Sequence, residues 1–239
     1  MIKELAKKLI KSLPFAFTQN QKYDRQTAEV IQRSCKPDST CIDVGCHKGE
    51  VLDMLLAASP AGKHYGFEPI PVLYEALRAK YTRPNITISN IALSNKRGET
   101  SFNYVVSNPA YSGLIKRKYD REDEQDTSIQ VQTDKLDDVL PANERVDFVK
   151  IDVEGGELLV LQGARQTLTR CKPVVIFECG LGASEFYGST PDMVFNVLTE
   201  CGLKVSLMEN WLNGRPALTQ KQFEQHYQNK SHYYFIAYP

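Results

Sequence analysis

The sequence predicts an α/β protein built on a mostly parallel sheet. Short apolar segments alternate along the chain with segments of helical periodicity, and helical crossovers between short strands make neighbouring strands parallel. A length of 239 residues with 42% hydrophobic residues is enough for one sizeable domain core. Two glycines in "IDVGCHKGEV" (42–51) follow the first apolar segment, and glycine there indicates a sharp turn that a ligand can approach closely.

The first part of the chain shows this alternation clearly. Strands are expected at 40–44, 63–68 and 85–93, and helices at 50–58 and 71–81. The strand segments are short apolar runs, whereas the helix segments repeat their apolar positions every three to four residues. This order predicts three parallel strands joined by helices.

Residues 100–133 interrupt the alternation. The segments 100–106 and 128–133 alternate like half-exposed strands, and the polar stretch between them has a basic run at 116–118 followed by acidic residues at 122–126. Such a stretch is typical of a solvated loop, and a mobile lid over a site is the alternative interpretation. The sequence therefore predicts an insertion at about 100–133.

The alternation resumes after the insertion. Further strands are expected at 146–153, 173–179, 203–209 and 232–239, and helices at 156–168 and near 191–201. We expect 146–153 to be an apolar central strand, because buried parallel strands are continuous apolar runs. Without the insertion the sheet has seven strands. Residues 36–239 are thus expected to form a single domain, preceded by an N-terminal helical segment at 1–35.

The N-terminal segment has its own pattern. Apolar residues recur at helical spacing from Ile2 to Leu13, and lysines occupy the other face. This predicts an amphipathic helix that packs on the domain or, alternatively, docks on a membrane surface or a partner. The chain has no apolar run of about 18 residues for a membrane span and no secretory h-region. We expect a cytoplasmic protein, and the inner face of the membrane is the alternative location.

Composition excludes some classes of function. Lys plus Arg and Asp plus Glu number 29 each, so no global basic field favours nucleic acid as a partner. The six cysteines include no C-x-x-C pair. Free thiols in a reducing compartment fit this pattern better than disulfides or a zinc site.

Acidic residues stand at the ends of the expected strands. They are Asp43, Glu68, Asp152 with Glu154, and Glu178. In an open parallel sheet, ligands bind at the carboxyl ends of the strands. Because unpartnered carboxylates are costly there, the row predicts a ligand site.

The glycine turn narrows the class of ligand. Its pattern is D-x-G-x-x-x-G rather than the G-x-G-x-x-G of dinucleotide sites. An acid beside the turn would repel a pyrophosphate but suits an ammonium group, and Glu68, at the end of the next strand, can accept hydrogen bonds from ribose hydroxyls. S-adenosylmethionine has both an amino-acid end and a nucleoside end.

Six segments together resemble the FkbM family of S-adenosylmethionine-dependent methyltransferases across about residues 40–180. They are "IDVGCHKGEV", "YGFEPIPVLYEAL", "NIALSNKRGETSF", "TDKLDDVL", "VDFVKIDVEGGELLVLQGA" and "PVVIFE". The chain differs in having Cys46-His47 where the family often has Ala-Asn, and "EGGE" where it usually has "EGAE".

The resemblance implies a class I methyltransferase fold, which is Rossmann-like. Such a fold has a seven-stranded, mostly parallel sheet with its last strand antiparallel and helices on both faces. The implied reaction is methyl transfer to an oxygen, usually a sugar, glycan or natural-product hydroxyl. By position, Asp43, Gly45, His47 and Gly49 resemble the loop around the methionine part of the cofactor.

The same resemblance extends to the rest of the cofactor. Glu68, with Pro69 in "GFEP", resembles the ribose acid, and Asn90 and Ala92 lie where similar enzymes place adenine. Asp152, together with Glu154, is expected to border the methyl donor and the acceptor.

An alcohol must lose a proton as it is methylated, so a base within hydrogen-bond reach is expected. We expect Asp152 or Glu154 to be that base, with Glu178 or Glu157 tuning it through like-charge proximity. An alternative for Glu154 and Glu157 is stabilisation of the following helix start. No metal is expected, and a divalent cation between Asp152 and Glu178 is the alternative.

Two other functions remain open at this point. A nicotinamide-dependent oxidoreductase would use a related sheet, although the sequence lacks its glycine fingerprint. A cofactor-binding module without transfer activity would keep the same pocket. The sequence does not identify the acceptor, for which a small molecule or a glycan hydroxyl is expected.

Overall fold

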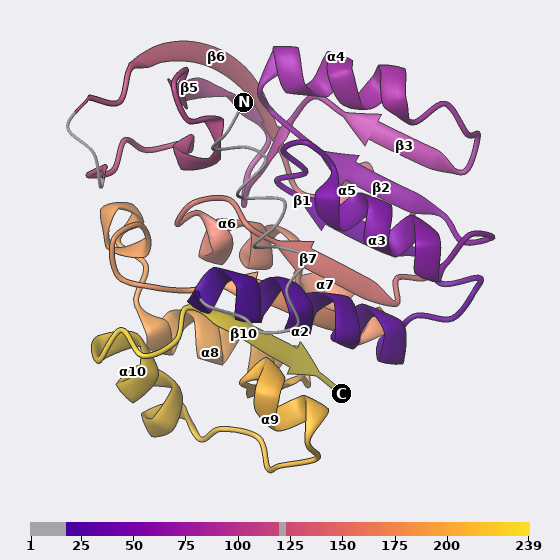
Figure 1. Cartoon of the computed structure of the whole chain (residues 1–239), viewed down its shortest axis with the longest axis vertical. Helices are drawn as coiled ribbons and strands as arrows, with labels where there is room; N and C mark the ends of the chain where they lie inside the picture. Colours follow the sequence, from indigo (N-terminus) through magenta and orange to yellow (C-terminus); the bar gives the residue numbers. More distant parts are fainter. Residues whose placement is uncertain (1–17, 120–122) are drawn as a thin grey trace.

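The computed structural model describes residues 18–119 and 123–239. Its main sheet has seven strands in the order β3-β2-β1-β7-β8-β10-β9 (Figure 1). They are β1 (Cys41–Val44), β2 (His64–Phe67), β3 (Ile86–Ser89), β7 (Phe148–Ile151), β8 (Val174–Glu178), β9 (Lys204–Ser206) and β10 (Tyr234–Tyr238). Strands β3, β2, β1, β7 and β8 pair in parallel, and β10 is antiparallel to both β8 and β9. The expected sheet, including its antiparallel last strand, is confirmed.

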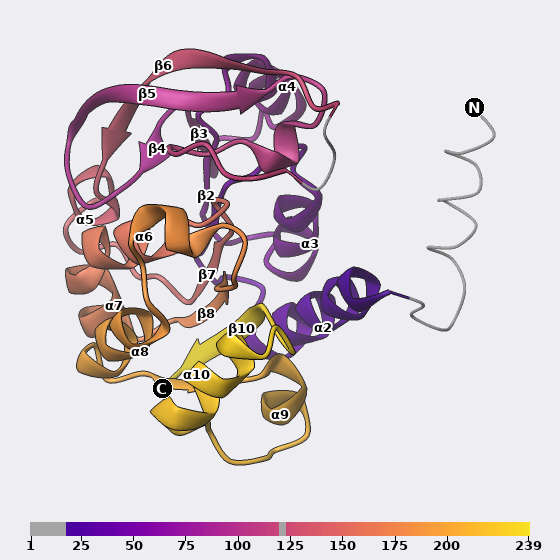
Figure 2. The same cartoon turned by 90° about the vertical axis from the view of Figure 1, so that its left-hand side faces the viewer.

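Helices cover both faces of this sheet (Figure 2). One face carries α2 (Gln19–Ser34), α3 (Glu50–Ala58) and α9 (Met208–Leu212), and the other carries α6 (Glu157–Gly163), α7 (Arg165–Cys171), α8 (Pro191–Glu200) and α10 (Gln220–Gln228). Strand side chains alternate between the faces. Cys41 and Phe148 pack with the first group of helices, and Ile42 and Val149 pack with the second.

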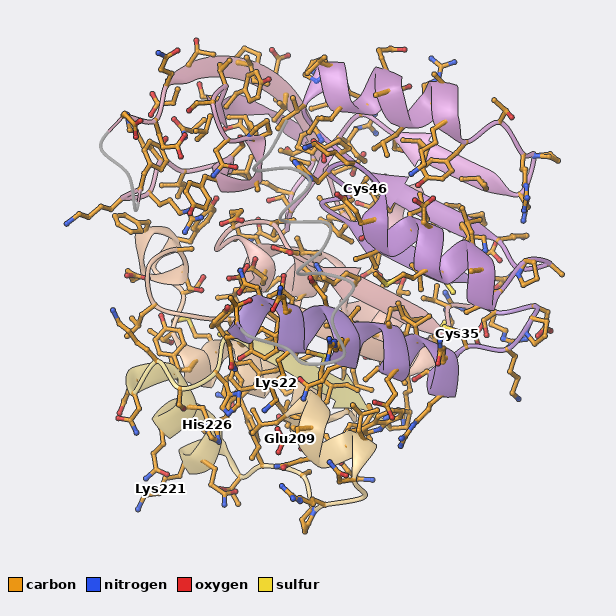
Figure 3. All side chains as sticks on the ribbon, in the orientation of Figure 1. Lys22, Cys35, Cys46, Glu209, Lys221 and His226 are labelled. Atoms are coloured by element: carbon orange, nitrogen blue, oxygen red, sulfur yellow. The ribbon has the colours of Figure 1, made fainter. Side chains whose placement is uncertain are left out.

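Helix α2 is part of the domain core. A capping box between Thr18 and Gln21 starts the helix. Tyr23 is buried, and its ring packs against Tyr234 of β10. Lys22 forms an ion pair with Glu209 of α9 (Figure 3). The amphipathic pattern from Ile2 to Leu13 lies outside the described residues. Among the helices that the structure describes, none is long and apolar enough to cross a membrane.

The insertion forms a second sheet. Strands β5 (Gly98–Val105) and β6 (Asp126–Asp134) pair antiparallel along their whole length, and β4 (Ala92–Leu93) joins β6. The segment 85–93 is therefore two strands in two sheets, and the prediction of one strand was wrong. The chain leaves the main sheet at Asn90, whose side-chain amide donates to the carbonyls of Glu68 and Pro69 at 2.8 and 2.9 Å.

Two other boundaries differ from the sequence predictions. The helix expected at 156–168 breaks at Ala164, because the carboxylate of Asp137 in α5 (Leu136–Val139) accepts from the backbone N–H groups of Gln166 and Thr167 and so starts a new helix. The strand expected at 203–209 ends at Ser206, where α9 soon begins. Helix α10 was not predicted. Helix α4 (Pro71–Lys80) agrees with its prediction, and it packs through Leu77 beside α3.

Gly163 fixes how closely α6 approaches the second sheet. A Cβ at this position would lie 2.0 Å from the backbone oxygen of Ser94. We expect Gly163→Ala to lower the free energy of unfolding by about 1–3 kcal/mol through overpacking, despite alanine's better helix propensity. Chemical denaturation measures this change.

The matched control is Gly98→Ala, because a Cβ there would meet only the Thr133 hydroxyl at 3.8 Å. Its stability is expected to stay within about 0.5 kcal/mol of the wild type. Equal stability of both variants would show that the contact at Gly163 is not tight.

Candidate functional site

A cavity of about 490 Å³ opens at the carboxyl ends of β1, β2 and β7, which is a volume typical of small-molecule sites. Most of the residues predicted for the site border it. These are Asp43, Gly45, His47, Glu68, Pro69, Ala92, Asp152 and Glu154. Gly49, Asn90 and Glu178 do not border the cavity, although each lies directly behind residues that do.

The glycine turn brings β1 and β7 together at the base of the cavity. Gly45 has φ +80°, and a Cβ there would lie only 1.9 Å from the backbone oxygen of Asp152. His47 is also left-handed at φ 50°, and Gly49 at φ +81° is the N-cap of α3. Position 45 requires glycine because no side chain fits there.

Asp43 is a buried carboxylate without a partner. It is 1% exposed, and neither of its carboxylate oxygens has a hydrogen-bond partner among the described residues. In the sheet register it stands beside Lys150. Burial raises its pKa to about 6, although the charge of Lys150 opposes this. An unsatisfied acid that borders a cavity fits a ligand that carries a cation or several donors.

Glu68 ties the turn after β1 to the turn after β2. Its two oxygens accept from the backbone N–H groups of His47 at 2.8 Å and Ile70 at 2.9 Å. Burial raises the pKa of this carboxyl to about 7. Each oxygen keeps a further lone pair for a ligand hydroxyl. Asn90 holds the same turn from behind by its bonds to the carbonyls of Glu68 and Pro69.

The apolar part of the cavity adjoins Pro69 and Ala92. Ile70, Leu73 and Phe102 line the wall beside these two residues. The second sheet contributes Phe102, and α4 contributes Leu73. This wall is suited to a planar base such as adenine.

Asp152 follows β7 and is held by two donors. Lys150 Nζ lies 2.8 Å from its Oδ2, and the Tyr234 hydroxyl donates to the same oxygen. Burial disfavours the charge on Asp152, but Lys150 outweighs it, so the pKa falls to about 2. Glu178 lies beside it, opposite Tyr234 in the sheet. Burial and then the neighbouring charge of Asp152 raise the pKa of Glu178 well above its usual value.

Glu154 has a different partner, which comes from the insertion. Its Oε2 lies 2.5 Å from the guanidinium of Arg117. Burial and then the neighbouring Asp152 raise the pKa of Glu154 to about 8. Glu157 accepts instead from the backbone N–H groups of Val153 and Gly155 at 3.0 and 3.2 Å. Both donors precede α6, so Glu157 holds the turn between β7 and α6, and α6 has no side-chain cap hydrogen bond.

Asp152, Glu154 and Glu178 each offer a carboxylate oxygen within 4.8 Å of the others. Such a set could hold a divalent cation. Two of the three already have a cationic side chain in contact, Lys150 for Asp152 and Arg117 for Glu154. These cations supply the counter-charge that the carboxylates require.

The geometry at the sheet ends can now be compared with known proteins. A model of the FkbM methyltransferase domain matches residues 43–205, which is more than half of the chain. The chain belongs to the FkbM methyltransferase family. Its methyl donor is S-adenosylmethionine.

Two curated proteins are similar to this chain at low sequence identity. The 2-O-methyltransferase NoeI of Sinorhizobium fredii is 26% identical over 168 residues, which cover 65% of this chain and 68% of that protein. Methyltransferase sdnD of Sordaria araneosa is 28% identical over 153 residues, which cover 51% of this chain and 59% of that protein. A crystal structure of methyltransferase FkbM from Methylobacillus flagellatus has a TM-score of 0.53 at 16% identity. It shares the fold, over 85% of this chain and 44% of its own.

Sequence reasoning missed three residues of this FkbM methyltransferase site. Lys150 stands inside the segment that was expected to be apolar, and a lysine in a buried strand is a signal of a paired carboxylate. Tyr234 comes from the last strand, and only the antiparallel pairing of β10 with β8 brings it to Asp152. Arg117 belongs to the basic run that was expected to be a solvated loop, yet its side chain is only 16% exposed.

The charge on Asp43 lowers the stability of the unliganded protein, whereas it favours binding of the ligand. Its pKa in the folded chain is raised from 3.8 to about 6, so stability that is present below pH 4 is lost as the pH rises towards 6. We expect Asp43→Asn to remove this loss. Relative to the variant, the unliganded wild type should lose about 2 kcal/mol between pH 4 and pH 8.

Thermal unfolding at the two pH values measures this difference. Calorimetry on the same samples should show S-adenosylmethionine bound at least about tenfold more weakly by the variant, which corresponds to one lost charged contact. Asp38→Asn is the control, since the Asp38 side chain is 66% exposed. If the stability of Asp43→Asn equals that of the wild type at both pH values, the assignment of Asp43 as an unpaired buried acid is wrong.

Proposed function

We propose that this methyltransferase transfers the methyl group of S-adenosylmethionine to a hydroxyl oxygen of a small molecule or sugar. The observation that carries the proposal is one cavity bordered both by Glu154 and by Asp43, whose buried oxygens accept no hydrogen bond from the described residues. The name of the relative NoeI, a 2-O-methyltransferase, supports oxygen as the acceptor atom.

The residues around the cavity fit the methyl donor. Asp43, Gly45 and His47 would hold its amino-acid end, Glu68 its ribose, and the wall at Pro69 and Ala92 its adenine. When bound, the donor supplies an electrophilic methyl group on a sulfonium, whose carbon–sulfur bond breaks with the electron pair left on sulfur. The protein's part is alignment of the acceptor and removal of its proton.

Glu154 suits the role of base better than Asp152. A base must take up a proton near neutral pH, and Asp152, with a pKa of about 2 and two donors on one oxygen, holds none. Glu154 has a pKa of about 8 and borders the cavity. Asp152 and Glu178 then act on Glu154 electrostatically. The acceptor proton would pass to a Glu154 oxygen as the acceptor oxygen takes the methyl group.

Calorimetric titration of S-adenosylmethionine and, separately, NAD into wild-type protein and Glu68→Ala tests the binding half of the proposal. We expect binding of the sulfonium donor alone, with a large loss in Glu68→Ala, because this variant leaves the His47 and Ile70 N–H groups without their acceptor. Binding without methyl transfer to any hydroxyl compound would favour the inactive cofactor-binding module instead.

Glu154→Gln tests the base. We expect kcat to fall by about 10²–10⁴ with unchanged binding of the donor, since the amide cannot accept the proton. Steady-state assays with an acceptor that the wild type methylates, together with calorimetry, separate these two effects. Glu75→Gln on the exposed side of α4 is the control. Full turnover in Glu154→Gln would remove Glu154 from the mechanism.

A further inference from the structure

Arg117 contacts Glu154 from the insertion rather than from the main sheet. Its guanidinium lies 2.5 Å from Glu154 Oε2, and the two side chains are 16% and 19% exposed. The same guanidinium lies 4.5 Å from the centre of the Tyr111 ring. The pair is therefore largely withdrawn from water, where a charge-assisted contact of this kind is strong.

Several contacts hold the segment that presents Arg117. Gly113 exchanges two backbone hydrogen bonds with Asn103 of β5, and the backbone N–H of Ile115 donates to the Tyr187 hydroxyl at 3.1 Å. On the side next to Arg117, Lys116 forms an ion pair with Asp126 of β6 at 2.6 Å. Arg117 is thus placed by both the second sheet and the loop after β8.

The groups that face Glu154 are mostly acidic or phenolic. Asp152 and Glu178 come from the ends of β7 and β8, and Glu157 begins α6. Tyr187 and Tyr234 add two phenols with raised pKa values. These acids favour a protonated Glu154. Two cations oppose them, Lys150 and Arg117.

Lys150 is already engaged, because its ammonium group lies on Asp152. Arg117 is the cation in direct contact with Glu154 among the described residues. Arg117 does not itself border the cavity, so its effect on the reaction passes through Glu154.

We propose that Arg117 is a positioning residue for the methyl transfer, whose charge favours the carboxylate form of Glu154 and whose contact orients that carboxylate towards the acceptor hydroxyl. This inference rests on the proposed function, in which Glu154 removes the hydroxyl proton. The insertion thereby helps to set the base.

Carbon-13 NMR of protein labelled at the glutamate carboxyl carbons tests the effect on Glu154 directly and requires no acceptor. Glu154→Gln assigns the resonance by removing it. We expect Arg117→Gln to raise the pKa of Glu154 by about 1 or more, a tenfold weaker acid. Arg117→Lys, which keeps the charge, should leave it within about 0.5. An unchanged titration in Arg117→Gln would overturn the inference.

Two further variants keep this test decisive. Lys116→Gln removes the neighbouring cation of the same segment, so a shift of Glu154 in this variant would mean that the placement of the segment, not the Arg117 charge, controls Glu154. Arg117→Met keeps an apolar stem against Tyr111 and replaces Arg117→Gln if that variant unfolds.

The pH dependence of kcat, measured with an acceptor that the wild type methylates, provides the functional readout. A base works only when deprotonated, so in Arg117→Gln the loss of activity on acidification should begin at a pH about 1 higher. A uniform loss at every pH would indicate a structural role and overturn the inference. If Glu154→Gln retains full turnover, the base assignment fails and the role of Arg117 fails with it. If Glu154→Gln is inactive but Arg117→Gln keeps the wild-type pH profile, only the inference fails.

Discussion

The acidic end of the sheet depends on one buried cation. Lys150 is 4% exposed, stands beside Asp43 in the register and binds Asp152 directly. Its charge favours the anionic forms of both acids, and Glu178 also acts on it from the next strand. Buried carboxylates without such a cation would bind protons instead of ligands. The methyltransferase site therefore requires a lysine at a position where the strand otherwise needs an apolar residue.

The acids around the cavity have separate tasks because their surroundings differ. Neither oxygen of Asp43 accepts a hydrogen bond within the described part of the chain, so both are left for a ligand. Each oxygen of Glu68 accepts one hydrogen bond from a turn that borders the cavity. Oδ2 of Asp152 accepts from both Lys150 and Tyr234. Glu154 differs from all of them, because its partner comes from outside the main sheet. Identical chemical groups thus differ in hydrogen bonding and in charge because different segments of the chain surround them.

The sequence was sufficient to predict the sheet, the family and most residues that border the cavity, because strand periodicity and acids at strand ends are local signals. It was insufficient where the determinant is a contact between distant segments. The break at Ala164 depends on Asp137, and the departure of the chain from the main sheet at Asn90 depends on two carbonyls of another turn. Tyr234 and Arg117 belong to the site only through long-range pairing and the course of the insertion, and neither has a local motif.

The central pairing of β1 with β7 also has a kinetic consequence. These strands are far apart in the chain, and Thr40 beside β1 donates to Asp147, 107 residues later. The turn at Gly45 and the carbonyl of Asp152 meet only when this pairing exists. Closing so long a loop is slow and has a large entropic cost. The ability to bind the methyl donor should therefore arise late in refolding. During synthesis, β7 must leave the ribosome before the emerging chain can bind the donor.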